Sequence, residues 1–279
     1  MPQRRLRLDA ELVRRGLARS REHAGELIAA GRVSVNRAVA SKPATHVTTD
    51  ADLVVRADET DPGFASRGGH KLAGALAAFA PSGLAVAGRR CLDAGASTGG
   101  FTDVLLRAGA REVVAVDVGY GQLVWGLRND ARVQVHDRTN VRDLTVELIG
   151  GAVDLVVGDL SFISLTLVVD ALIGVTDADG DLVLMVKPQF EVGKERLGKG
   201  GVVRDPALRS EAVETVLSAA GARGWGGRGV VASPLPGPSG NVEFFVWLRR
   251  GPRELAPDAV VAEAARSASW GVPGEKVRT

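Results

Sequence analysis

From residue 90 onward, the chain alternates short Val- and Leu-rich segments with segments that suit helices. The apolar segments predict strands at 90–94, 112–117, 132–136, 153–158, 181–186, 229–233 and 242–248. Strands that alternate with helices form βαβ units, whose mostly parallel sheet is covered by helices on both faces. We therefore expect an α/β domain with a mostly parallel, seven-stranded sheet.

Composition describes an ordinary globular chain and narrows its class. With 279 residues, 45% of them hydrophobic and 24% charged, the sequence is long enough for one large domain and one small one. No apolar run approaches the roughly 18–20 residues that cross a bilayer, and the N-terminus lacks the apolar core of a signal peptide. One cysteine and four scattered histidines make neither a disulfide framework nor a thiolate zinc site. We expect a cytoplasmic protein that neither spans a membrane nor holds a metal.

Positive charge is concentrated near the N-terminus. Residues 1–42 hold ten Lys and Arg against four Asp and Glu, whereas the rest of the chain holds 25 against 29. Basic side chains displace condensed counterions from phosphate backbones, so this asymmetry favours a polyanionic partner. Charge alone leaves open a basic surface that simply faces solvent.

Two short helices and two strands are predicted within this basic segment. The helices cover 8–17 and 21–30, with Ser20 as the N-cap of the second, and the strands cover 33–37 and 52–56. A stretch with acids and Pro62-Gly63 but no periodicity follows, which is typical of a linker. The predicted organisation is a small α+β domain at 1–57, a linker at 58–66, an α/β domain at 67–250, and a tail at 251–279 that can form a helix.

The basic segment resembles a known RNA-binding module. The resemblance is carried by Arg7-Leu8-Asp9, by Leu17-Ala18-Arg19-Ser20-Arg21, and by the run from Ile28 to Asn36. These residues are similar to the alpha-L RNA-binding motif of a ribosomal small-subunit protein and of many RNA-modifying enzymes. The resemblance implies RNA contacts from Arg7, Arg19, Ser20, Arg21 and Arg32, together with Arg67 at the start of the second domain. A helical cap domain that binds no nucleic acid is the alternative.

A glycine-rich turn follows the first strand of the α/β domain. The run from Cys91 to Phe101 reads as strand, turn and then helix, and the turn lies at the carboxyl end of the strand, where doubly wound sheets bind ligands. Glycines let a ligand approach the backbone, and the N-terminus of the helix offers free N–H groups. The turn is neither the dinucleotide fingerprint, because Ala94 and Ser97 occupy glycine positions, nor a Walker loop, because no Gly-Lys-Ser/Thr follows.

Carboxylates follow the first three strands of the domain. Asp93 precedes the turn and could receive a ligand amine, Asp117 could accept both hydroxyls of a ribose, and Asp137 could accept an adenine amino group. This layout resembles Rossmann-like S-adenosylmethionine-dependent methyltransferases. The resemblance implies a cofactor site made of Asp93, Gly95, Ser97, Gly99, Gly100, Phe101, Asp117 and Asp137. A nicotinamide enzyme remains an alternative, as does a helix-capping role for Asp117.

Four charged residues of the α/β domain are candidates for catalysis. Asp159 ends the fourth strand, Lys187 ends the fifth, Lys71 begins the first helix of the domain, and Glu243 lies in the last strand. In this order they resemble the Lys-Asp-Lys-Glu tetrad of FtsJ-like RNA ribose 2′-O-methyltransferases. The resemblance implies that Lys187 orients or deprotonates a ribose hydroxyl while its neighbours position it. Separate salt bridges and surface charges are the alternative interpretation.

Longer motifs resemble one family within this group. They are the segments 66–72, 93–103, 159–165, 186–191 and 199–206, which are similar to the TlyA family. The resemblance implies methylation of a cytidine 2′-hydroxyl in 16S or 23S ribosomal RNA, or in both, by a protein that docks on ribosomal subunits. It leaves open which subunit is used and the oligomeric state. The alternatives are a ribosome-assembly factor on a methyltransferase fold, a DNA or protein methyltransferase, and a membrane-active haemolysin.

Overall fold

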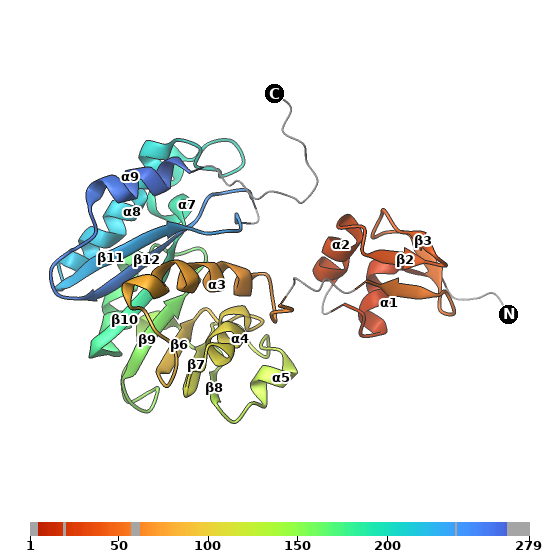
Figure 1. Ribbon diagram of the computed structural model, residues 1–279, viewed down its shortest axis with the longest axis horizontal. Helices are drawn as coiled ribbons and strands as arrows, with labels where there is room; N and C mark the ends of the chain where they lie inside the picture. Colours follow the sequence, from red (N-terminus) through yellow and green to blue (C-terminus); the bar gives the residue numbers. More distant parts are fainter. Residues whose placement is uncertain (1–4, 19–20, 57–61, 238, 267–279) are drawn as a thin grey trace. The chain divides into compact units, whose positions relative to one another are not determined.

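The computed structural model describes residues 5–18, 21–56, 62–237 and 239–266. The chain divides into two compact units, residues 1–62 and residues 63–279 (Figure 1). Each unit has its own buried hydrophobic core. Among the described residues, no helix is both long enough and apolar enough to cross a membrane.

The N-terminal unit is a small α+β fold. Its elements are β1 (Arg5–Arg7), α1 (Leu8–Arg14), α2 (Arg21–Ala29), β2 (Val33–Val35), β3 (Ala38–Val39), β4 (His46–Thr48) and β5 (Leu53–Val55). Strand β1 pairs with β4, and β2 lies between β3 and β5. The two helices bury Leu8, Leu12 and Ile28 in a shared core. Helix α1 ends three residues earlier than predicted because the chain turns through Gly16, whose φ is +71°. Arg19 and the predicted N-cap Ser20 lie outside the described residues.

The C-terminal unit contains the predicted seven-stranded, mostly parallel sheet, which confirms the α/β fold. Its strands are β6 (Arg90–Ala94), β7 (Glu112–Val116), β8 (Val133–His136), β9 (Val153–Gly158), β10 (Thr176–Val186), β11 (Trp225–Ala232) and β12 (Phe244–Arg250). Their order across the sheet is β11-β12-β10-β9-β6-β7-β8. Within the described residues, β12 is the one strand of this sheet that runs opposite to the others.

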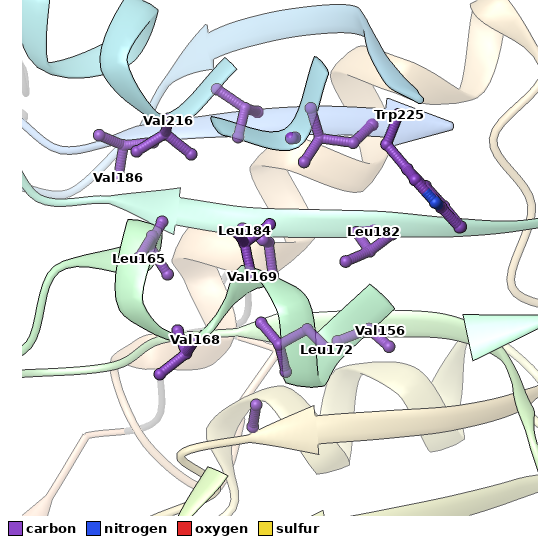
Figure 2. Close-up of a cluster of buried hydrophobic side chains, with 14 of the residues drawn as sticks. Val156, Leu165, Val168, Val169, Leu172, Leu182, Leu184, Val186, Val216 and Trp225 are labelled. Atoms are coloured by element: carbon purple, nitrogen blue, oxygen red, sulfur yellow. The ribbon is translucent and has the colours of Figure 1, made fainter. Parts of the chain in front are cut away.

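Helices cover both faces of the sheet (Figure 1). They are α3 (Gly68–Phe79), α4 (Gly100–Arg107), α5 (Trp125–Arg128), α6 (Val169–Gly174), α7 (Pro188–Glu191), α8 (Pro206–Gly221) and α9 (Pro257–Ala265). Side chains of β9 alternate between the faces: Leu155 and Val157 join the core under α3 and α4, whereas Val156 joins the core under α6 and α8. Figure 2 shows the second of these clusters, where Val156 lies with Leu172 of α6.

Two boundaries differ from the prediction in ways that affect the site. Strand β10 begins at Thr176, earlier than the predicted start at 181. The prediction missed its first residues because they are polar and mostly exposed and carry no apolar pattern. Strand β12 begins at Phe244, so Glu243 precedes the strand instead of lying in it. Val186 pairs with Phe244 in the antiparallel register, which brings Glu243 to the edge where β10 ends.

Candidate active site

The predicted site residues gather where the parallel strands end. Gly158 of β9 is paired with Ala94 of β6 on one side and with Leu184 of β10 on the other. Asp159 and Lys187 follow β9 and β10 directly, so they leave the sheet at one edge. The apolar strands therefore place the charged residues together even though they are distant in sequence.

Lys187 and Asp159 form an ion pair at this edge. The Lys187 Nζ lies 2.7 Å from Asp159 Oδ1 and also donates a 2.8 Å hydrogen bond to Ser161 Oγ. Only 9% of the lysine side chain is exposed, whereas Asp159 keeps 23%. A buried ammonium held by a carboxylate and a hydroxyl has a fixed position, as a group that orients a substrate hydroxyl requires.

Lys71 and Glu243 form a second ion pair. Lys71 Nζ donates to Glu243 Oε2 at 2.6 Å, and both side chains are buried. Lys71 lies in the first turn of α3, which begins at Gly68, three residues earlier than predicted. The backbone also approaches Glu243 closely, because a Cβ at Gly237 would come within 2.5 Å of Oε1. The four predicted catalytic residues are thus arranged as two ion pairs.

Two adjoining cavities open at this edge. The larger, about 550 Å³, is lined by Gly95, Ser97, Asp117 and Asp159 among others. The smaller, about 310 Å³, is lined by Lys187, Glu243 and the glycine-rich loop around Gly200 and Gly201. Ser161 and Phe162 belong to the walls of both cavities. One cavity could therefore hold a cofactor while a substrate enters the other.

The glycines of the turn are required by packing within the protein. Gly95 has a φ of +87°, and a Cβ there would lie 2.8 Å from the carbonyl oxygen of Asp159. Gly99 has a φ of +100°, and Gly100 lies so close to α3 that a Cβ would come within 2.8 Å of the Gly69 nitrogen. Among these three glycines, Gly95 lines the larger cavity. Close approach to a ligand, the reason predicted for the glycines, stays a prediction.

Asp117 faces the larger cavity and holds the glycine turn. Its Oδ2 accepts a hydrogen bond from the Ser97 backbone N–H at 2.8 Å, and its Oδ1 accepts from the Gly119 N–H at 2.7 Å. A carboxylate has about four acceptor sites, so each oxygen keeps one for a ligand hydroxyl. Asp117 thus lies beside Ser97 in the cavity wall with acceptor sites to spare, and its predicted ribose-binding role stays a prediction.

Asp93 lies behind the turn rather than in the cavity wall. It is fully buried, and its Oδ2 accepts a 2.7 Å hydrogen bond from Thr102 Oγ1 of α4. Burial raises the pKa of Asp93 to about 7, and the bond from Thr102 opposes that shift. Its Oδ1 has no hydrogen-bond partner among the described residues. The structure thus places Asp93 as a support between β6 and α4.

Two further predicted cofactor residues are not part of the wall of the larger cavity. Phe101 is 4% exposed and packs against Phe245, with ring centroids 5.9 Å apart, because the first turn of α4 points into the core. Asp137 pairs with Arg128 at 2.8 Å, and that guanidinium holds the pKa of its carboxyl below the usual range. Neither residue lines the cavity predicted for a cofactor.

Sequence reasoning missed several polar residues of the larger cavity, Arg142 among them. Gln122 and Asn140 both line it. Asn140 also accepts a 3.0 Å hydrogen bond from the Arg142 N–H, which caps a short 3-10 helix. Asn140 lies four residues beyond β8, where a polar residue in a loop gives no distinctive sequence signal.

The predicted RNA-binding arginines are largely exposed. Arg7 and Arg21 both donate to the buried carboxylate of Asp9, at 2.8 Å and 3.0 Å, and keep 44% and 60% of their side chains exposed. Arg32 donates to the Arg56 carbonyl oxygen at 3.0 Å. Arg67 is exposed at the start of α3. The buried acid therefore fixes two guanidinium groups without removing them from the surface.

Comparisons with known proteins agree with this architecture. The model of the FtsJ-like methyltransferase family matches residues 64–250, and that of the S4 domain matches residues 6–53. A relative from Mycobacterium tuberculosis (strain H37Rv), named 16S/23S rRNA (cytidine-2′-O)-methyltransferase TlyA, is 63% identical over 88% of this chain and 90% of its own length. Hemolysin A from Brachyspira hyodysenteriae is 36% identical over 86% of this chain and 98% of its own length.

A solved structure supports the same relationship. It is a candidate hemolysin from Streptococcus thermophilus, 37% identical, with a TM-score of 0.75 over 94% of both chains. The matched segments include both units in the predicted order and all four residues of the two ion pairs. The protein is therefore a member of the TlyA family of FtsJ-like methyltransferases.

Proposed function

We propose that the protein transfers a methyl group from S-adenosylmethionine to the ribose 2′-hydroxyl of a cytidine in ribosomal RNA. The observation that carries this proposal is the arrangement of two ion pairs, Lys187–Asp159 beside both cavities and Lys71–Glu243 beside the smaller one. The named activity of the Mycobacterium tuberculosis relative supports the choice of substrate. The proposal includes a cytoplasmic location, where ribosomal subunits are available.

The larger cavity fits the cofactor. Its volume of about 550 Å³ falls within the range of roughly 300–1,000 Å³ that is usual for ligand sites. Asp117 would accept the ribose hydroxyls, while Gly95 and Ser97 would line the cofactor where the turn begins. Asn140 and Gln122 add polar groups to the same wall. When bound, S-adenosylmethionine supplies an electrophilic methyl group on sulfur.

Lys187 and its partners prepare the ribose hydroxyl. A hydroxyl is a weak nucleophile, and its proton must leave as the new bond to carbon forms. The Lys187 ammonium would hold the 2′-oxygen, and the adjacent carboxylate of Asp159 would accept the departing proton. Lys71, itself fixed by Glu243, adds a second positive group on the substrate side. Alignment of oxygen, carbon and sulfur at an approach of about 3 Å would supply much of the rate.

The RNA would be bound by both units. Arg7, Arg21 and Arg32 of the N-terminal unit suit phosphate and sugar contacts, which add affinity with little sequence preference. Phe162 is 91% exposed in the wall between the cavities, and an exposed ring there could stack on an unpaired base. The proposal is thus that the C-terminal unit recognises the target nucleotide. The N-terminal unit would dock the protein on the RNA.

The test is methyl transfer to defined particles. The protein and S-adenosylmethionine with a labelled methyl group are incubated with unmethylated small subunits, large subunits and their naked RNAs, and products are mapped by nuclease digestion and mass spectrometry. Label on a cytidine ribose supports the proposal. Absence of transfer to all four substrates, with cofactor binding demonstrated, would overturn it and favour the role of a ribosome-assembly factor.

A further inference from the structure

Two segments of the site run side by side beyond the sheet. The first, residues 159–165, follows β9, and the second, residues 187–191, consists of Lys187 and helix α7. They are neighbours because β9 and β10 are adjacent parallel strands whose last pairing joins Gly158 to Leu184. Residues 159–165 are called the first segment below, and residues 187–191 the second segment.

Three contacts connect these segments along their length. Lys187 binds Asp159 and Ser161 at the beginning. The rings of Phe162 and Phe190 lie 5.5 Å apart in the middle. Glu191 closes the far end, where the first segment enters the short 3-10 helix Leu165–Leu167. The Glu191 contact differs from the Lys187 contact because Glu191, Ser164 and Leu165 line neither cavity.

Glu191 makes two hydrogen bonds across the segments. Its Oε2 accepts from Ser164 Oγ at 2.5 Å, and its Oε1 accepts from the Leu165 backbone N–H at 2.9 Å. Ser164 is the N-cap of the 3-10 helix, and Leu165 is 1% exposed in the core. Glu191 therefore fixes the point at which the first segment returns to the core.

The first segment needs an anchor of this kind. The backbone of Phe162 has a φ of +64°, a left-handed conformation that residues other than glycine rarely adopt. Its ring is 91% exposed. Such a conformation persists only where the flanking structure holds it. Lys187 holds the chain before Phe162 through Asp159 and Ser161, and Glu191 holds it afterwards through Ser164.

We propose that Glu191 is a positioning residue for methyl transfer. By binding Ser164 and Leu165 it keeps the first segment in register with the second, so that Asp159 and Phe162 stay in place beside Lys187. This inference rests on the proposed methyltransferase function and adds a residue outside the tetrad to it.

The energetics of Glu191 favour this role over a purely structural one. Burial raises the pKa of its carboxyl, while the hydrogen bonds from Ser164 and Leu165 oppose the shift. A buried carboxylate costs more in desolvation than an apolar side chain of similar size would. The two directed hydrogen bonds to Ser164 and Leu165 are what the acid contributes at this position.

The test compares three variants in the full-length protein. Glu191→Leu removes both acceptors, whereas Glu191→Gln keeps both contacts, because its amide oxygen accepts from Leu165 and its NH₂ donates to Ser164 Oγ. Ser164→Ala removes one contact and serves if Glu191→Leu does not fold. Glu147→Leu, at an exposed glutamate that lines neither cavity, is the matched control.

The measurements are the single-turnover rate on ribosomal RNA, the S-adenosylmethionine dissociation constant and the melting temperature. We expect Glu191→Leu to lower the rate at least tenfold and Ser164→Ala about threefold, with a smaller loss of cofactor affinity in each variant. Glu191→Gln and Glu147→Leu should stay within threefold of the wild-type rate.

Several results would overturn the role of Glu191. They are a Glu191→Leu rate within twofold of the wild type, a parallel loss of cofactor affinity and rate, or an equal loss in Glu191→Gln. A wild-type protein that transfers no methyl group to ribose would instead contradict the proposed function, so the two failures are distinguishable.

Discussion

Lys71 Nζ and Glu243 Oε2 lie 2.6 Å apart although 172 positions separate the two residues in the chain. Helix α3 begins the C-terminal unit and β12 is its last strand, so this ion pair joins the two ends of the fold. The contact exists because β12 runs opposite to β10, which places the residue before β12 at the edge where β10 ends.

Removing one partner of this pair should destabilise the protein strongly. The remaining charge would be buried without compensation, which typically costs about 3–5 kcal/mol. We expect Glu243→Ala to lower the free energy of unfolding by that order, measured by urea denaturation. The double replacement Lys71→Met with Glu243→Leu should recover most of the stability while activity stays lost. Equal stability of the single and double variants would contradict this account.

Lys187→Ala should separate catalysis from cofactor binding. Loss of the group that positions the hydroxyl for proton transfer lowers the rate by about 10²–10⁴-fold, whereas Lys187 lines only the smaller of the two described cavities. Single-turnover methylation and isothermal titration with S-adenosylmethionine measure the two effects. Normal turnover in this variant would remove Lys187 from the mechanism.

Asp117 and Asp137 should differ in their effect on the cofactor. Asp117→Asn keeps one carbonyl oxygen for the Ser97 and Gly119 N–H groups and the ribose, so S-adenosylmethionine affinity should fall about tenfold, or about 1.4 kcal/mol. Asp137→Asn is the matched control, because Asp137 pairs with Arg128 away from the cavity, and its affinity should change less than threefold. The reverse ranking would restore Asp137 as the cofactor ligand.

Asp93 should make stability depend on pH. Its folded-state pKa of about 7 lies above the usual value of 3.8, so the folded state binds the proton more tightly than the unfolded state does. The resulting stabilisation is fully present below about pH 4 and is lost as the pH rises through about 7. We expect Asp93→Asn to flatten the change in melting temperature between these values. An unchanged pH profile would show that Asp93 does not titrate there.

Arg21 should contribute to RNA affinity through charge. It keeps 60% of its side chain exposed beside Asp9, and each phosphate contact contributes a slope of about −0.9 to −0.7 to the salt dependence of binding. Arg21→Ala should therefore weaken binding to ribosomal RNA and reduce the salt slope by nearly one, measured by filter binding at several salt concentrations. Arg196→Ala, which breaks a surface pair with Glu211, provides the comparison.

The sequence was sufficient to predict the sheet and its charged edge. Continuous apolar strands such as Val153–Gly158 are recognisable without tertiary information, and the residue that follows each parallel strand must lie at the same edge. This rule predicted that Asp159 and Lys187 would lie at the same edge of the sheet. It also indicated Asp117, which follows β7.

Side-chain direction and partner choice could not be predicted in this way. Phe101 turns into the core and Asp137 turns toward Arg128 because of residues that are packed against them only in the folded chain. Likewise, nothing in a linear motif shows that Glu191 reaches Ser164, 27 positions away. The division of the four charged residues into two ion pairs also depends on the antiparallel direction of β12.

The antiparallel direction of β12 has a consequence during synthesis of the chain. Lys71 leaves the translating ribosome long before Glu243, so its ammonium has no buried counter-charge until the last hairpin is made. Completion of the sheet and neutralisation of Lys71 therefore occur in one late event, and an incomplete chain carries a hydrated lysine where the finished enzyme has a closed ion pair. Catalytic competence consequently requires that synthesis has passed Glu243 and that β12 has joined the sheet.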